Sequence, residues 1–138
     1  MIKSLGKKLG IKKKADVKAL WREKNEALVA AMKEGRISDA REAAQELLEL
    51  AESKLSRNDP ETATSYCNMG MVLLVEKEHE LAEECFREAL ALRRKIFGPD
   101  HKETALIYLN LIELYRQMAQ AVLYRTVETT DLKEDQED

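Results

Sequence analysis

The sequence has few of the residues that interrupt regular structure, with only five glycines and two prolines among 138 residues. This scarcity excludes collagen-like chains and disordered chains rich in proline and glycine. Two cysteines, Cys67 and Cys85, cannot make a disulfide framework and match no zinc-binding spacing, so we expect a reducing compartment and a cytoplasmic protein. No apolar run approaches the roughly 20 residues needed to cross a bilayer, and no secretion leader follows the lysine-rich start.

Charge is plentiful but unevenly distributed along the chain. Residues 1–14 carry six lysines and no acid, whereas residues 131–138 carry five acids and one lysine. The net charge of −3 therefore leaves about −5 on the residues between them, which argues against a nucleic-acid partner. The basic segment could contact an anionic membrane, but its glycines and few apolar anchors favour a flexible arm. We expect residues 129–138 to form an acidic disordered tail, because they have little to bury.

The sequence repeats itself with a period of 42 residues. When the chain is shifted by 42 positions, Glu61, Thr62, Ala63, Tyr66 and Asn68 fall on Glu103, Thr104, Ala105, Tyr108 and Asn110. Chance matching of abundant residues does not explain a block that includes tyrosine and asparagine. Within each unit the apolar residues recur at helical spacing, which predicts two helices joined by a tight turn.

Capping and turn residues indicate where the first helices begin and end. Asp16 fits the N-cap of the first helix, and Gly35 fits its end. Pro60 suits the first position of the third helix, where its missing N–H costs nothing, and Asp59 precedes it as the cap. These signals place the boundaries between the predicted helices in short polar segments.

The last predicted helix is longer than the others. Gly98 ends the helix before it, and Asp100 with Glu103 fits a capping pair at its start. The apolar spacing continues without glycine or proline, so we expect a helix from residue 101 to about 128. A weakly marked turn near Gln120 could divide it in two.

Four residues with a characteristic spacing link the sequence to a known family. Gly70, Ala82, Phe86 and Ala89 resemble the signature of tetratricopeptide repeats, in which small residues let helices approach closely and an aromatic residue fills the gap. The segment ALALRRKIFGPDHKETALIYLNLIELY resembles the 42-residue variant of this repeat found in kinesin light chains.

The resemblance covers about residues 19–118 and implies an all-α fold. The expected architecture is a right-handed α-α superhelix of antiparallel helical hairpins, with about five to six helices over residues 15–128. It implies two full repeats followed by a final helix that acts as a cap, since each repeat buries its apolar face only against its neighbours.

Signals for catalysis are weak. His79 and Glu83 lie four residues apart on one helix, but they make an incomplete metal shell that a surface charge pair explains equally well. For His101, in the GPDH turn, a structural role is favoured. Cys67 could be a reactive thiol if exposed, but a small apolar filler is favoured. Because the chain lacks a nucleophile elbow, a phosphate-binding loop and a dinucleotide fingerprint, we expect no enzyme activity, no cofactor and no metal site.

The resemblance further implies that the first helix of each repeat lines a concave groove that binds a partner. The transferred groove positions are Arg22, Asn25, Glu26, Val29 and Met32 in the first unit, Thr64, Cys67, Asn68, Met71, Leu74 and Val75 in the second, and Leu106, Leu109, Asn110, Glu113 and Arg116 in the third. In relatives an asparagine at the place of Asn68 and Asn110 holds the backbone of an extended peptide, and an amide can donate and accept at once. The alternative is an exposed asparagine with only a local hydrogen bond.

Several groove positions give their helices a second apolar face. They are Met71, Leu74, Val75, Leu106 and Leu109. Such a helix requires a second neighbour, which could be a partner peptide, a partner helix, another copy of the chain or the chain's own C-terminal helix. Cys67 and Leu109 stand where the lysines of a carboxylate clamp would be useful, which disfavours a C-terminal carboxylate as ligand.

We therefore predict a non-catalytic adaptor that binds a peptide or helix of another protein in its groove. The alternative is a homo-oligomer, such as a homodimer, that uses the same apolar faces.

Overall fold

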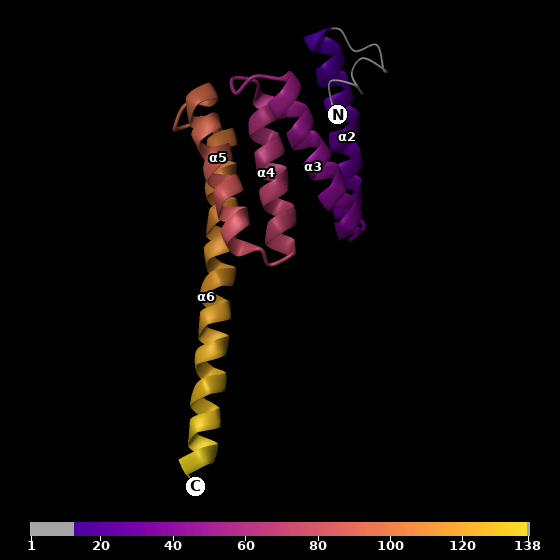
Figure 1. The fold of residues 1–138 in the computed structure, drawn as a ribbon. Coiled ribbons are helices and arrows are strands. Elements are labelled where there is room, and N and C mark those ends of the chain that lie inside the picture. The colour runs from indigo at the N-terminus through magenta and orange to yellow at the C-terminus, as the bar shows by residue number, and fades with distance from the viewer. Residues whose placement is uncertain (1–12, 138) are drawn as a thin grey trace.

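The computed structural model describes residues 13–137, which form five α-helices. They are α2 (Lys14–Lys33), α3 (Ile37–Lys54), α4 (Pro60–Val75), α5 (His79–Phe97) and α6 (Lys102–Glu137). Each helix packs against the next one along the chain, and the hairpins stand side by side (Figure 1). The predicted all-α repeat architecture is confirmed. Most of the predicted basic arm lies outside the described residues, and Lys14 at its end already belongs to α2.

The turns inside the two hairpins have the same geometry. Gly35 after α2 has a φ angle of 72°, and Lys77 after α4 has a φ angle of 63°. The closing hydrogen bonds also correspond: the N–H of Arg36 donates to the carbonyl of Ala31 at 2.9 Å, and the N–H of Glu78 donates to that of Leu73 at 2.9 Å. This arrangement is the Schellman motif, which satisfies carbonyls at the end of a helix. The backbone therefore repeats with the 42-residue period of the sequence.

The loops between hairpins repeat as well. The hydroxyl of Thr62 donates to the carbonyl of Ser56 at 2.8 Å, and that of Thr104 donates to the carbonyl of Gly98 at 2.8 Å. Both threonines are buried, so each hydroxyl gains its partner from the loop that precedes its helix. Pro60 occupies the first turn of α4, as predicted.

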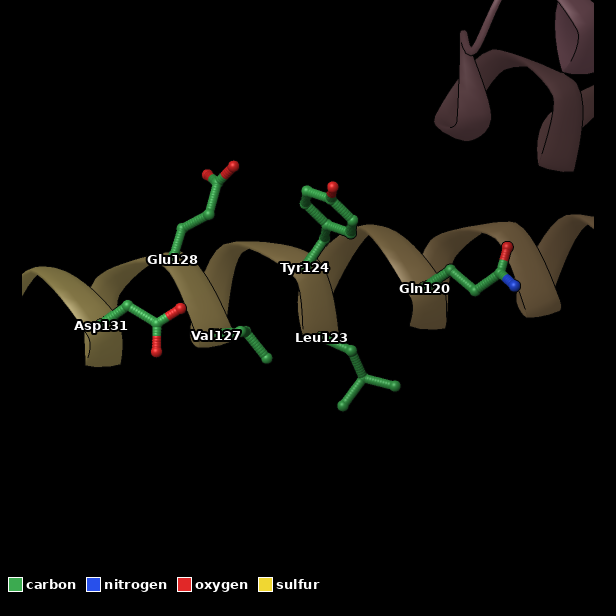
Figure 2. A pocket seen from close by; sticks show the side chains of 6 residues that line it. All are labelled: Gln120, Leu123, Tyr124, Val127, Glu128 and Asp131. Atoms are coloured by element: carbon green, nitrogen blue, oxygen red, sulfur yellow. The ribbon is translucent and has the colours of Figure 1, made fainter.

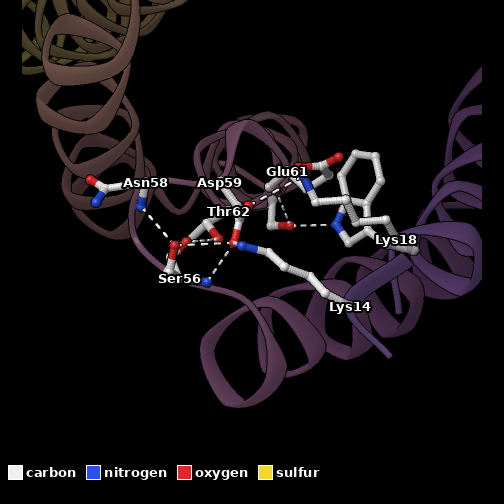
Figure 3. Close-up of polar contacts among 9 residues, drawn as sticks. Lys14, Lys18, Ser56, Asn58, Asp59, Glu61 and Thr62 are labelled. Atoms are coloured by element: carbon white, nitrogen blue, oxygen red, sulfur yellow. Dashed lines mark hydrogen bonds and ion pairs between the residues drawn. The ribbon is translucent and has the colours of Figure 1, made fainter. Parts of the chain in front are cut away.

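Asp59 anchors the first of these loops. Its carboxylate accepts a hydrogen bond from the N–H of Ser56 at 2.8 Å and pairs with Lys14 at 2.7 Å and Lys18 at 3.2 Å (Figure 3). Burial alone would raise the pKa of this carboxyl, but the two ammonium groups and Ser56 hold the pKa well below its usual range. The start of α2 is thereby tied to the loop before α4.

Two predicted caps were wrong. α2 begins at Lys14, so Asp16 lies inside its first turn instead of preceding it.

At α6 the capping residue is His101 and not Asp100. The carbonyl of His101 accepts the N–H of Thr104 at 3.0 Å, and its Nδ1 accepts the N–H of Glu103 at 3.1 Å. The imidazole also stacks on Phe97, with ring centroids 4.6 Å apart, so the structural role favoured for His101 is confirmed.

The signature residues meet between α4 and α5. A Cβ atom added to Gly70 would come within 2.6 Å of the Phe86 ring, so only glycine permits this approach. Ala82 and Ala89 are fully buried on the same side of α5 as Phe86. The small residues therefore allow close packing of the two helices, and Phe86 fills the space between them.

α6 is a single unbroken helix that ends at Glu137 instead of near residue 128. The tail predicted to be disordered is thus helical over residues 129–137, although the side chains of residues 119–136 are exposed. Neither glycine nor proline interrupts it, and the hydroxyls of Thr126 and Thr130 donate to carbonyls one turn earlier. Its C-terminal half projects beyond the other four helices (Figure 1).

Candidate partner-binding face

The predicted groove residues lie on three helices that occupy equivalent places in successive units. α4 contacts both α2 and α6, so the first helices of the units form one continuous surface. We call this surface the α2–α4–α6 face. Its predicted members are Arg22, Asn25, Glu26, Val29, Met32, Thr64, Cys67, Asn68, Met71, Leu74, Val75, Leu106, Leu109, Asn110, Glu113 and Arg116.

The two key asparagines make the same contact in successive units. Asn68 Nδ2 donates to Asn25 Oδ1 at 2.7 Å, and Asn110 Nδ2 donates to Cys67 Sγ at 3.4 Å. Each partner lies 43 residues earlier in the chain, on the preceding first helix. Both asparagines are half-buried. Their hydrogen bonds link neighbouring helices, so the alternative of a purely local bond is wrong.

The apolar groove positions divide into exposed and buried groups. Met71, Val75, Leu106 and Leu109 are exposed, with Leu109 retaining 61% of its accessible surface. Cys67 and Leu74 are buried in the core, so the expectation that Leu74 lies outside the core was wrong. The 42-residue repeat explains why these positions differ in burial. Leu109 and Arg116 of α6 correspond to Cys67 and Leu74 of α4, but within the described chain α6 is not followed by the first helix of another unit.

Burial also determines the chemistry of the cysteines. Burial raises the pKa of the Cys67 thiol, although nearby Arg93 and the hydrogen bond from Asn110 act in the opposite direction. Burial likewise raises the pKa of Cys85 to about 11. Both thiols are therefore protonated near neutral pH, which supports packing as their role and not nucleophilic reactivity.

Comparison with known families agrees with this geometry. Residues 61–122, which include all of α4 after Pro60, α5 and the first part of α6, match the family model described as tetratricopeptide repeat. This segment is a tetratricopeptide-repeat unit. The more specific likeness to the kinesin-light-chain variant stays a prediction. The search of curated proteins gave no match.

Arg93 is a charged residue of this tetratricopeptide-repeat domain that the sequence reasoning missed. It lies on α5 and is buried, with 5% of its surface exposed. Its Nη1 donates to the carbonyl of Glu103 at 2.9 Å and its Nη2 to the hydroxyl of Thr64 at 3.4 Å. The signal was available in the repeat, since Arg93 falls on buried Ala51 when the sequence is shifted by 42 residues. Arg93 thus fixes the side chain of one groove residue and joins α4 to the start of α6.

The polar end of the α2–α4–α6 face is held by an ion pair within α6. Arg116 donates to both carboxylate oxygens of Glu113, at 2.8 and 2.6 Å. These bonds, together with one from Gln117, lower the pKa of Glu113 to about 2. Because the two charges satisfy one another, this pair presents a nearly neutral surface to a partner.

Two other features do not form enclosed sites. Glu83 accepts hydrogen bonds from Arg87 and Tyr115 and not from His79. No group of three or more metal-ligating side chains occurs within residues 13–137. The hollow in Figure 2 is lined by six residues that all belong to α6. With no second element opposite them, these residues form an open helix surface. None of the helices described here is long and apolar enough to span a membrane.

Proposed function

We propose that this protein is a non-catalytic adaptor, and that its α2–α4–α6 face binds a peptide or a helix of a partner protein. The tetratricopeptide-repeat unit makes the chain a protein–protein interaction module. The observation that carries the finer proposal is the matched pair of half-buried asparagines, Asn68 and Asn110, each fixed by a bond to the preceding helix. The proposal includes no cofactor and no catalytic step, and it places the protein in the cytoplasm.

Asn68 and Asn110 suit an extended backbone because the NH₂ group of each amide already donates a hydrogen bond while its oxygen is still available to accept one. Their Nδ2 atoms donate to Asn25 and Cys67, whereas neither Oδ1 accepts a hydrogen bond from the described part of the chain. A peptide N–H can donate to such an oxygen. Because the side chains are already oriented, a partner binds with a smaller entropic cost than it would against free amides.

Apolar side chains flank the asparagines on the same helices. Met71 and Val75 on α4 and Leu106 on α6 are all exposed and can cover the side chains of a bound segment. Methionine and leucine adapt to different shapes, so this part of the face contributes affinity with little selectivity. The expected ligand therefore has apolar side chains on a backbone that donates hydrogen bonds to the two amides.

The test uses peptides selected by display against the full chain and then measured by calorimetry. Replacing both asparagines, Asn68→Ala with Asn110→Ala, should weaken binding by roughly tenfold or more, because each neutral hydrogen bond contributes about 1 kcal/mol. Asn58→Ala is the matched control, since this exposed asparagine lies in the loop before α4, away from the face. Equal affinity of the double variant and the control would contradict the proposed role of the amides.

A further inference from the structure

A second apolar surface lies on α6, distinct from the α2–α4–α6 face. We call it the α6 seam. It consists of Tyr108, Ile112, Tyr115, Ala119, Val122 and Thr126. All six side chains are exposed. Their alternating spacing of four and three residues is the pattern by which one helix packs along another in a coiled coil.

The internal repeat shows that this surface corresponds to one that is covered elsewhere in the molecule. Shifted by 42 residues, Tyr108, Ile112 and Tyr115 fall on Tyr66, Gly70 and Leu73 of α4. Gly70 and Leu73 are buried on α4, and Phe86 of α5 lies against Gly70. No helix follows α6 within the described chain, so no helix takes the place of α5 on its equivalent surface there, where only the hydroxyl of Tyr115 is engaged, with Glu83 and Arg87 of α5.

The residue at the centre of the contact determines which kind of helix can cover the seam. Gly70 permits contact so close that even a Cβ atom would lie 2.6 Å from Phe86. Ile112 at the same place excludes that approach. A covering helix must therefore lie at the larger separation of side-chain interdigitation, about 8–10 Å between axes.

The seam is complementary to itself when two copies run antiparallel about residue 117. In that register Tyr115 of one copy lies opposite Ala119 of the other, Ile112 opposite Val122, and Tyr108 opposite Thr126. Each large side chain meets a smaller one, and every pair occurs twice, as a two-fold axis requires.

Charge favours the same orientation. The projecting end of α6 carries exposed Asp131, Glu134 and Asp135 with one exposed base, Lys133, whereas exposed Arg94, Lys95 and Lys102 outnumber exposed Asp100 near the start of α6. An antiparallel pair places the acidic end of each copy beside the end of the other where bases outnumber acids, with Lys102 next to Asp131. A parallel pair would place the two acidic ends together, which is unfavourable.

We infer that a second copy of this chain covers the α6 seam, forming an antiparallel two-fold dimer in which the projecting half of each α6 lies along the packed half of the other. Each projecting half then buries its seam residues, Ala119, Val122 and Thr126, against Tyr115, Ile112 and Tyr108 of the other copy. The α2–α4–α6 face is left open, so the dimer is compatible with partner binding but independent of it.

The oligomeric state of the full chain tests this inference. Light scattering coupled to size exclusion should give the mass of a dimer at high concentration. Val122→Glu should halve that mass, because a charge would be buried in the seam, while circular dichroism should show an intact fold since Val122 lies beyond the array. Leu106→Glu is the matched control on the other face of α6 and should leave the dimer unchanged. A monomeric wild type, or a dimer that survives Val122→Glu, would overturn the inference.

Cysteine cross-linking determines the orientation. In a background with Cys85→Ala, variants Tyr108→Cys and Thr126→Cys should form a disulfide-linked dimer when mixed and little when each is oxidised alone. A parallel, in-register pair would give the reverse pattern, with each variant linking to itself. Either that pattern or the lack of any cross-link would refute the antiparallel arrangement.

Discussion

α4 and α6 occupy the same place in successive units, yet one is enclosed and the other is half exposed. Both begin after a loop held by a buried threonine, Thr62 or Thr104, and both carry a key asparagine. α4 lies between α3 and α5, whereas α6 packs mainly on α5 and then continues into solvent. The comparison teaches that similar repeat sequences are buried or exposed according to the neighbours that follow them, and that a few divergent positions decide which neighbour fits.

The largest effect on stability should come from exchanging Gly70 of α4 and Ile112 of α6, which differ although they are equivalent in the repeat. Gly70→Ile should destabilise the protein by about 3 kcal/mol or more, because its side chain has to enter the space of the Phe86 ring. The reciprocal change, Ile112→Gly, should cost at most about 1 kcal/mol, chiefly through lower helix propensity. Urea unfolding followed by circular dichroism, on samples dilute enough to be monomeric, measures both free energies.

Gly70→Ala provides a graded control for this exchange. It adds only the Cβ atom, which already lies 2.6 Å from the ring, so its cost should fall between zero and that of the isoleucine variant. Similar free energies of unfolding for Gly70→Ile and Ile112→Gly would show that the close approach of α4 and α5 is not what distinguishes the two units.

The last residue of the loop that enters α4 is Asp59, and its equivalent in the loop that enters α6 is His101. Asp59 has a lowered pKa in the folded state, so its contribution to stability is present above about pH 4, the usual value for the unfolded chain, and is lost as the pH falls below it. Asp59→Asn should cost about 2 kcal/mol at neutral pH through the weakened contacts with Lys14 and Lys18. The difference from wild type should shrink as the solution is acidified.

Asp100→Asn is the matched control for this pH dependence, because Asp100 is exposed in the equivalent loop. Its unfolding free energy should follow that of the wild type at every pH. A constant difference between Asp59→Asn and wild type from neutral to strongly acidic pH would show that ionisation of Asp59 does not stabilise the loop.

Features set by local chemistry were predictable from the sequence. Gly35 and Pro60 mark helix boundaries because of their backbone preferences, and Gly70 with Phe86 identified the hairpin contact through a recognisable spacing. The positions of Asn68 and Asn110 on one face followed from the repeat. Their partners did not, since a bond to the side chain 43 residues earlier depends on how successive units are stacked.

The errors arise where long-range packing overrides local signals. The helical spacing placed Leu74 on a second face of α4, but the stacked helices bury it in the core. The chain turns at Lys77 although no glycine is there, whereas Ala119, its equivalent, lies within a continuous helix. α5 supplies an apolar stripe that stabilises the turn at Lys77. After Ala119 the corresponding residues are Tyr124, Glu128 and Asp131, which cannot pack in that way.

The smallest predicted effect concerns the turn that α4 makes and α6 does not. Lys77 adopts a φ angle of 63°, a conformation that costs a residue with a Cβ atom about 1 kcal/mol, while its equivalent Gly35 adopts 72° without that cost. Lys77→Gly should stabilise the protein by about 0.5 kcal/mol, because relief of strain exceeds the entropy that glycine adds to the unfolded chain. Gly35→Lys should destabilise it by a similar amount. Since both turns share the same Schellman bonds, equal signs for the two changes in urea unfolding would mean that packing around each turn, and not its backbone angle, controls its stability.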